Sequence, residues 1–311
     1  MKNGMEIKEA DGPAVALTTE RLMAENSRMT DYWEMTKPRL TFLVLVTTLV
    51  GFCMGSSAPI NWMLLLNAML GTALVAGGAA VLNQYLEKDF DARMKRTEDR
   101  PLPSGRLAAD DALLFGASLS VLGLLYLAWR VNLLTAFLAA FTLSSYLFAY
   151  TPLKRKSPLC TLVGAIPGAI PPMMGWSAAK DSLGTGAWIL FAILFLWQMP
   201  HFYALAQVYR EDYARGGFPM LSVLDPDGRR TGLEIMVYTL ALLPVSLAPS
   251  YVGMTGRLYF WCALLLSLGF LAFGLAAATR RTIPSSRKLF LASIFYLPFI
   301  LILMVANKSP L

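Results

Sequence analysis

The chain repeatedly runs for 18 or more residues almost without charge, and this feature restricts its fold most strongly. Of its 311 residues, 56% are hydrophobic and only 15% are charged. Runs of this length suit membrane-spanning helices, whereas barrel strands are shorter and alternate in polarity. We therefore expect an all-α fold, a polytopic membrane helical bundle of nine transmembrane helices. The expected spans are 40–58, 62–86, 112–129, 132–150, 158–178, 185–208, 234–255, 258–278 and 289–306.

The basic residues are sorted between the two sides of these spans. Of the 27 Lys and Arg residues, 23 lie in the N-terminal segment or after the second, fourth, sixth and eighth spans. Because basic residues are retained in short cytoplasmic loops, this predicts a cytoplasmic N-terminus and a C-terminus on the opposite side. Topology and anionic lipid headgroups thus account for the net charge of +7, and we expect no nucleic-acid partner.

The polar N-terminal residues contain no apolar core of the signal-peptide type. We expect residues 1–36 to form a flexible cytoplasmic extension and residues 37–311 to form a single intramembrane domain. Cys53, Cys160 and Cys262 are scattered among the spans without CxxC spacing. They indicate neither a disulfide framework nor a zinc site.

The second span leads into the segment NQYLEKDFDARMKRTEDRPLPSGR, residues 83–106. If the helix continues, Asn83, Glu87 and Asp91 form one acidic stripe that drifts only about 40° per step. Its carboxylates rise about 6 Å apart, a spacing that suits a hard cation bridging to phosphate, with Mg²⁺ the natural candidate. Asp89 lies about 200° from Glu87 and faces elsewhere.

Such charges could also be a solvated helix end in the headgroup layer. The following residues favour a site, because the prolines and glycine of RPLPSG break the helix. The resulting loop would fold Arg96, Arg100 and Arg106 near the stripe. Carboxylates with convergent arginines indicate a metal-bound polyphosphate.

The fourth span ends in YLFAYTPLKRK, where Tyr146 and Tyr150 lie one turn apart and Lys154 follows. The basic residues have a simple alternative role in topology and lipid contact. Lys154, directly after a Thr-Pro turn, could equally reach a diphosphate oxygen.

The sixth span ends in WQMPHFYALAQVYREDYARGG and carries the chain's single histidine, His201, after Pro200. If the helix continues, His201 and Asp212 share a face, with His201 some 16 Å deeper. This arrangement would place an axial ligand or proton-transfer group beneath a second acidic site. The alternative is a neutral histidine bonded to a carbonyl that Pro200 frees.

These residues resemble the UbiA superfamily of intramembrane prenyltransferases, whose first motif is N-x-x-x-D-x-x-x-D followed by a basic RPLPSG-type loop. Glu87 stands in place of the first Asp. YTPLKR and WQMPHF resemble, more closely, the branch of the superfamily that farnesylates haem. One departure concerns the second acidic motif, because Tyr209 and Tyr213 stand at its expected Asp positions and leave Asp212 as the preferred ligand, with Glu211 as the alternative.

The resemblance implies transfer of a farnesyl group from farnesyl diphosphate to a vinyl group of haem b, with addition of water, giving haem O and diphosphate. The enzyme would lie in a bacterial cytoplasmic membrane, where both substrates suit a lipid-open cavity. Whether a haem A synthase or a terminal oxidase is a physical partner stays open. The implied site residues are Asn83, Glu87, Asp91 and Asp212 for Mg²⁺, Arg100, Lys154 and Arg96 for the diphosphate, Tyr146 and Tyr150 around the allylic cation, and His201 for haem or proton transfer.

Three other functions compete with this interpretation. A secondary transporter also carries polar residues in broken helices, but its site lies near the bilayer midplane and not at a charged helix end. Another prenyltransferase of the superfamily, acting on a quinone precursor or a chlorophyll, would differ only in its acceptor. A membrane scaffold gives no reason for three acidic and amide groups at four-residue spacing.

Overall fold

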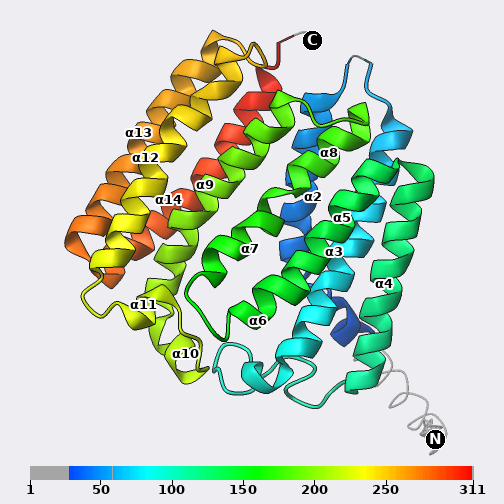
Figure 1. The fold of residues 1–311 in the computed structure, drawn as a ribbon, viewed down its shortest axis with the longest axis vertical. Helices are drawn as coiled ribbons and strands as arrows, with labels where there is room; N and C mark the ends of the chain where they lie inside the picture. Colours follow the sequence, from blue (N-terminus) through cyan, green and yellow to red (C-terminus); the bar gives the residue numbers. More distant parts are fainter. Residues whose placement is uncertain (1–27, 58, 310–311) are drawn as a thin grey trace, which may run out of the picture.

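The structure is a computed structural model that describes residues 28–57 and 59–309. Its regular elements in these residues are helices, and most run along the long axis of the molecule (Figure 1). The helices are α2 (Pro38–Gly55), α3 (Trp62–Asp91), α4 (Ala109–Arg130), α5 (Leu133–Ser144), α6 (Thr151–Leu153), α7 (Cys160–Ala169), α8 (Pro171–Lys180), α9 (Thr185–Val208), α10 (Arg210–Arg215), α11 (Leu221–Leu224), α12 (Arg229–Tyr251), α13 (Arg257–Arg280) and α14 (Ile283–Ala306), with a π-helix, η1 (Ser145–Tyr150), between α5 and α6.

Eight helices of the described chain are long and apolar enough to cross a membrane. They correspond to eight of the nine expected spans, with α5, η1 and α6 together forming the span Leu133–Leu153. Large apolar side chains such as Phe148, Trp129 and Ile302 are exposed on them. Lipid is the environment that suits so much exposed apolar surface on helices of this length.

The expected fifth span, 158–178, is two helices of 10 residues each, α7 and α8, and not one unbroken helix. The break falls at Ile170 because Pro171 and Pro172 begin α8. Proline has no backbone N–H to donate into the preceding turn, and its ring disfavours helical geometry in the residue before it. The sequence expectation of one continuous helix is thus corrected here, while the place of the span in the chain is retained.

Two glycines allow α2 and α8 to pack backbone to backbone. A Cβ atom on Gly175 would lie 1.8 Å from the Thr48 carbonyl oxygen, and one on Gly51 would lie 1.9 Å from the Pro172 carbonyl oxygen. Both contacts are with backbone atoms, which cannot rotate away. Helix α2 is therefore held tightly against the second half of the broken span.

The helices form two groups in the bundle. In one group α9, α12, α13 and α14 pack on one another, and in the other α2 contacts α8 and α3, while α3 contacts α4. Helix α7 joins the groups through its contacts with α9 and η1. The largest buried cluster runs through both groups and includes Leu190, Leu242 and Ile300.

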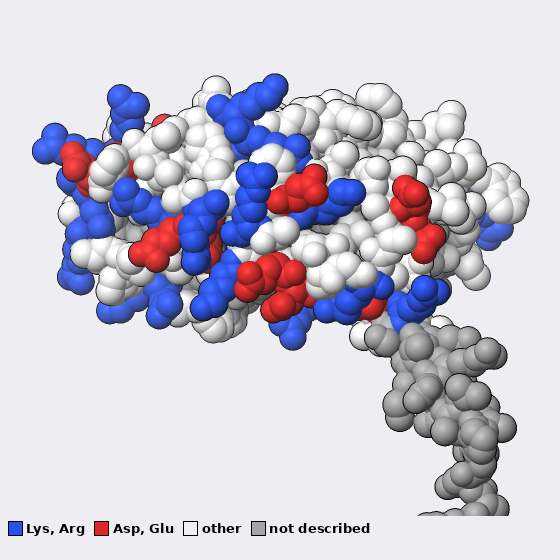
Figure 2. Space-filling model, turned by 90° about the horizontal axis from the view of Figure 1, so that it is seen from below, with Lys and Arg blue, Asp and Glu red and all other residues white. Residues whose placement is uncertain are grey.

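One end of the bundle carries most of the polar loops, and we call it the charged end. It contains the C-terminal end of α3, with α6, α10 and α11 beside it (Figure 1). Figure 2 looks onto this end and shows Lys, Arg, Asp and Glu side chains gathered over its left and central parts. At the opposite end, Lys308 donates to the Cys53 and Ser56 carbonyls where α2 finishes.

The expected flexible extension, 1–36, falls partly outside the described residues. Its last part is ordered, because residues 28–35 are helical and Met35 is fully buried. Asp31 accepts from Arg106 at 2.8 Å, and Tyr32 packs edge-to-face on Phe115. Within the expected extension, a few apolar side chains of the polar segment thus pack the helix of residues 28–35 against the bundle.

Candidate functional site

The acidic stripe of Asn83, Glu87 and Asp91 lies inside the protein at the end of α3. Helix α3 continues to Asp91, as the spacing predicted, and the three residues are only 3%, 2% and 1% exposed. Asp89 on the same helix is exposed to solvent. The helix period thus places Asn83, Glu87 and Asp91 on a buried face and Asp89 on a solvent-exposed face. Buried carboxylates require partners that compensate their charge.

Each carboxylate of the stripe has its own cation. The Lys154 ammonium donates to both oxygens of Glu87 at 3.1 Å, and Lys154 is itself buried. The Arg100 guanidinium donates to Asp91 Oδ2 at 2.6 Å. Two cations from separate loops, both expected from the sequence, therefore meet the stripe.

The amide of Asn83 also has a basic partner, which sequence reasoning missed. Lys37 Nζ donates to Asn83 Oδ1 at 3.1 Å, and Asn83 Nδ2 donates to the Thr151 hydroxyl at 3.2 Å. Lys37 precedes Pro38 and has a left-handed backbone, with φ 48°. Burial first, and then the charges of Arg100 and Lys154, lower the pKa of Lys37 to about 8, so that it is still mostly protonated at pH 7. The available signal was a lysine directly before the first apolar span.

The three arginines of the loop after α3 go to different places, and not together to the stripe as expected. Arg100 reaches Asp91, whereas Arg106 pairs with Asp31 and with Glu34, at 3.1 Å, on the helix over residues 28–35. The Arg96 guanidinium lies over the rings of two tyrosines at the α9–α10 junction. Only Arg100 binds the stripe directly.

Tyr146 and Tyr150 stack in the π-helix η1, with ring centroids 5.5 Å apart and an interplanar angle of 12°. The π-helix arises where Pro152 cannot donate, and the Thr151 N–H reaches back to the Tyr146 carbonyl. Gly164 lets the Tyr150 ring approach α7, since a Cβ there would lie 2.5 Å from the ring. The expected neighbours thus become a stacked pair beside the segment that carries Lys154.

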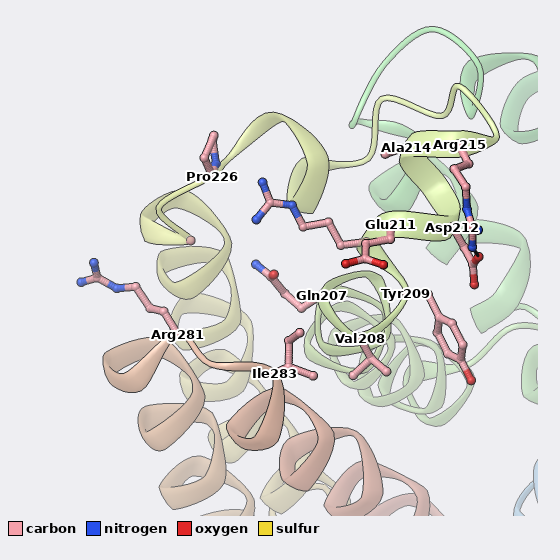
Figure 3. Close-up of a pocket in the computed structure, with 12 residues that line it drawn as sticks. Gln207, Val208, Tyr209, Glu211, Asp212, Ala214, Arg215, Pro226, Arg281 and Ile283 are labelled. Carbon is pink, nitrogen blue, oxygen red and sulfur yellow. Dashed lines mark hydrogen bonds and ion pairs between the residues drawn. The ribbon is translucent and has the colours of Figure 1, made fainter.

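The α9–α10 junction does not gather acidic ligands. Asp212 accepts from Arg215 three residues later, and Glu211 is exposed. Both line a cavity of about 540 Å³ together with Arg210 and Arg281. Figure 3 shows Asp212 and Arg215 side by side at one edge of this cavity, with Glu211 nearer Gln207.

His201 lies within α9, which continues through Pro200 to Val208. Its Nδ1 is 2.7 Å from the Ser293 hydroxyl of α14, and its ring stacks on Trp197 with centroids 4.9 Å apart. The common face expected for His201 and Asp212 required one continuous helix, whereas α9 ends at Val208 and Asp212 lies on the separate helix α10. His201 thus forms a hydrogen bond with the Ser293 hydroxyl, and not with a carbonyl freed by Pro200 as in the alternative expectation.

The donors of the stripe fit a hard cation, provided that a ligand completes its shell. Carboxylate and amide oxygens are what Mg²⁺ prefers, and it usually binds through one or two carboxylates together with substrate phosphates. Within residues 28–57 and 59–309, no group of three or more His, Cys, Asp or Glu could hold a metal ion. Asp212 is therefore not part of a three-acid cluster with the stripe.

The comparisons with known proteins agree with this architecture. Residues 44–299 match the model of the UbiA prenyltransferase family. The chain belongs to that family. It is thus an integral membrane protein of a prenyltransferase family.

Several relatives of this UbiA chain are strongly similar over most of its length. A protoheme IX farnesyltransferase of Solibacter usitatus is 50% identical, over 91% of this chain and 100% of the relative. Another from Koribacter versatilis is 42% identical, over 91% of this chain and 94% of the relative.

The fold is also that of solved UbiA structures. A structure of digeranylgeranylglyceryl phosphate synthase matches with a TM-score of 0.78 at 16% identity, covering 90% of this chain and 98% of that one. A UbiA homologue from Archaeoglobus fulgidus bound to GPP and Mg²⁺ matches with a TM-score of 0.64 at 14% identity, covering 88% and 99%.

Proposed function

We propose that the chain transfers the farnesyl group of farnesyl diphosphate to a vinyl group of haem b, with addition of water, giving haem O and diphosphate. The observation that carries the chemistry is the buried stripe, on which three basic residues converge from three segments of the chain. The acceptor and donor are those in the names of its similar relatives, the protoheme IX farnesyltransferases. Residues 37–311 would act as one domain.

The stripe would hold Mg²⁺ through Asn83, Glu87 and Asp91, with diphosphate oxygens completing the shell. Such a metal ion would neutralise charge on the departing diphosphate. A structure of the A. fulgidus homologue contains GPP and Mg²⁺ together, which supports this pairing of ligands. Asp212 was expected as a fourth ligand, and its carboxylate pairs with Arg215.

The basic residues would bind the leaving group. When the allylic C–O bond breaks, its electron pair leaves with the diphosphate, and Lys154, Arg100 and Lys37, which contact the stripe, would turn to those oxygens. Fixed cations in a water-poor site stabilise developing negative charge more strongly than mobile solvent does. The stacked rings of Tyr146 and Tyr150 would face the allylic cation and stabilise it by about 0.5–2 kcal/mol.

The acceptor then forms the new bond. The terminal vinyl carbon of haem attacks the allylic carbon, and water adds to the other vinyl carbon and loses a proton. His201 would bind or orient haem, or accept that proton. We place the enzyme in a bacterial cytoplasmic membrane, with the charged end facing the cytoplasm, because 23 of 27 basic residues are sorted to that side.

The decisive experiment is incubation of purified protein with haem b, farnesyl diphosphate and Mg²⁺, followed by mass analysis of the haem. The expected product gains one farnesyl group and one hydroxyl group. Glu87→Gln and Asp91→Asn should abolish it, whereas Asp89→Asn, a carboxylate change on the exposed face of the same helix, should not. Release of diphosphate with a quinone precursor but not with haem would overturn the choice of acceptor.

A further inference from the structure

The α9–α10 junction holds a cation of its own. The Arg96 guanidinium lies 5.2 Å from the ring centroid of Tyr209 and 5.6 Å from that of Tyr213. Tyr213 is buried and Tyr209 is 37% exposed, so that one ring is fixed in the core and the other borders solvent. Two rings from one short segment thus position an arginine that comes from the loop after α3.

The same junction offers poor ligands for a second metal ion. Its two carboxylates are outnumbered by cations, because the cavity is lined by Asp212 and Glu211 together with Arg210, Arg215 and Arg281, and Arg215 pairs with Asp212. The other oxygens are tyrosine hydroxyls, which are not the carboxylate, carbonyl or water oxygens that Mg²⁺ prefers. The donor set therefore does not fit a metal site, whereas the rings of Tyr209 and Tyr213 hold a positive charge at the same junction.

The way in which Arg96 is held leaves it able to bind an anion. A cation–π contact uses the face of the guanidinium, whereas its N–H groups point outward in the plane. Among the described residues, no hydrogen bond or ion pair occupies those N–H groups, and the side chain is exposed. The planar fork of an arginine matches two phosphate oxygens at once.

Aromatic contacts connect Arg96 to the stripe. Tyr213 packs edge-to-face on Phe218 with centroids 6.3 Å apart, and Lys154 Nζ lies 4.5 Å above the Phe218 ring. Lys154 in turn binds Glu87. Arg96 and Lys154 thus each lie over one ring of a contacting pair, Tyr213 and Phe218, and this pair connects the cation of the α9–α10 junction to a cation of the stripe.

We propose that Arg96, held between Tyr209 and Tyr213, supplies the positive charge for the diphosphate at the α9–α10 junction, and that this junction binds no metal ion. The inference rests on the proposed function, since it assigns the diphosphate of the same substrate. Arg96 is then a substrate-binding residue, and the two tyrosines are positioning residues that act through their ring faces.

Binding of farnesyl diphosphate to the purified protein, measured by calorimetry without haem, tests the cation. Arg96→Gln should weaken binding at least about tenfold, as expected for a charge-assisted bidentate contact, and Arg96→Lys should recover only part of the loss. Arg93→Gln is the matched control, because Arg93 is a neighbouring arginine over the Phe90 ring. Equal effects of Arg96→Gln and Arg93→Gln would overturn the assignment.

Variants of the exposed Tyr209 distinguish a ring face that holds Arg96 from a hydroxyl that binds a metal ion. Tyr209→Phe keeps the face and should bind like the wild type, whereas Tyr209→Leu should weaken binding about two- to fivefold, the range of an exposed cation–π contact. If Tyr209→Phe weakens binding as much as Tyr209→Leu does, the hydroxyl and not the ring face contributes to binding, and the proposed role of Tyr209 in holding Arg96 is wrong.

Metal stoichiometry is the second readout. Mn²⁺ bound in the presence of farnesyl thiodiphosphate can be counted by electron paramagnetic resonance in the wild type and in Asp212→Asn. Equal counts are expected, and loss of one ion in Asp212→Asn would overturn the metal-free junction. These readouts use no haem, so a protein that farnesylates another acceptor would fail the proposed function and still pass this test.

Discussion

Removing one partner of the Glu87–Lys154 ion pair should destabilise the protein more than replacing both partners does. The Glu87 side chain is 3% exposed and that of Lys154 11%, with both carboxylate oxygens 3.1 Å from the ammonium. Lys154→Gln would leave a buried carboxylate without its nearest cation. The double variant, with Glu87→Gln as well, replaces the pair by two neutral amides of similar shape.

The expected size follows from the burial of both groups. Removing one partner of a buried pair costs about 3–5 kcal/mol, whereas replacing both can be nearly neutral. Lys37 and Arg100 lie close by in the same site, so that the remaining charge of Glu87 is partly compensated. We therefore expect Lys154→Gln to lower the free energy of unfolding by about 2–3 kcal/mol, and the double variant to recover at least about half of this.

Unfolding of the purified protein in mixed micelles, followed by tryptophan fluorescence against denaturing detergent, measures these differences. Lys156→Gln is the matched control, since Lys156 is exposed in the same basic segment. Mg²⁺ should stabilise Lys154→Gln more than the wild type, because a bound cation replaces the missing ammonium. A double variant less stable than Lys154→Gln, or no added effect of Mg²⁺, would refute the reasoning.

Three further changes test other parts of the structure. Gly175→Ala should destabilise the protein by about 1–3 kcal/mol in the same unfolding assay, because its Cβ would meet an α2 carbonyl oxygen at 1.8 Å, whereas Gly269→Ala, with nothing within 4 Å, should have little effect. Lys37→Met should raise the KM for farnesyl diphosphate about tenfold without unfolding the protein; an unchanged KM would remove Lys37 from the substrate site. Ser293→Ala should weaken haem binding, measured by absorbance titration, less than His201→Ala does, and unchanged titration of His201→Ala with lost turnover would exclude ligation.

Hydropathy and helix period were enough to predict the spans and the stripe. Eight of the nine expected spans are helices long and apolar enough to be recognised alone, and the four-residue spacing placed Asn83, Glu87 and Asp91 on one face and Asp89 on another. These features depend only on neighbours in the sequence, which is why no tertiary information was needed.

The partners of the stripe required the fold. Arg96 and Arg106 look equivalent in the loop after α3, but one reaches Tyr209 and the other Asp31, because loop paths depend on what packs beneath them. Lys37 has a left-handed backbone and lies 46 residues before its partner Asn83, so spacing could not connect them. Pairings across the bundle carry no periodic signal.

The charge balance at the charged end explains why such pairings matter for function. The stripe contributes two carboxylates, and Lys37, Lys154 and Arg100 compensate them with one positive charge in surplus. A buried site with this surplus is stable without a ligand, yet it favours an incoming anion, since each cation can exchange a carboxylate oxygen for a phosphate oxygen. Arg96 adds one further positive charge over aromatic rings, where no carboxylate must be displaced. A second metal ion beside it would raise this surplus of positive charge further, and the added repulsion favours the guanidinium as the cation at the α9–α10 junction.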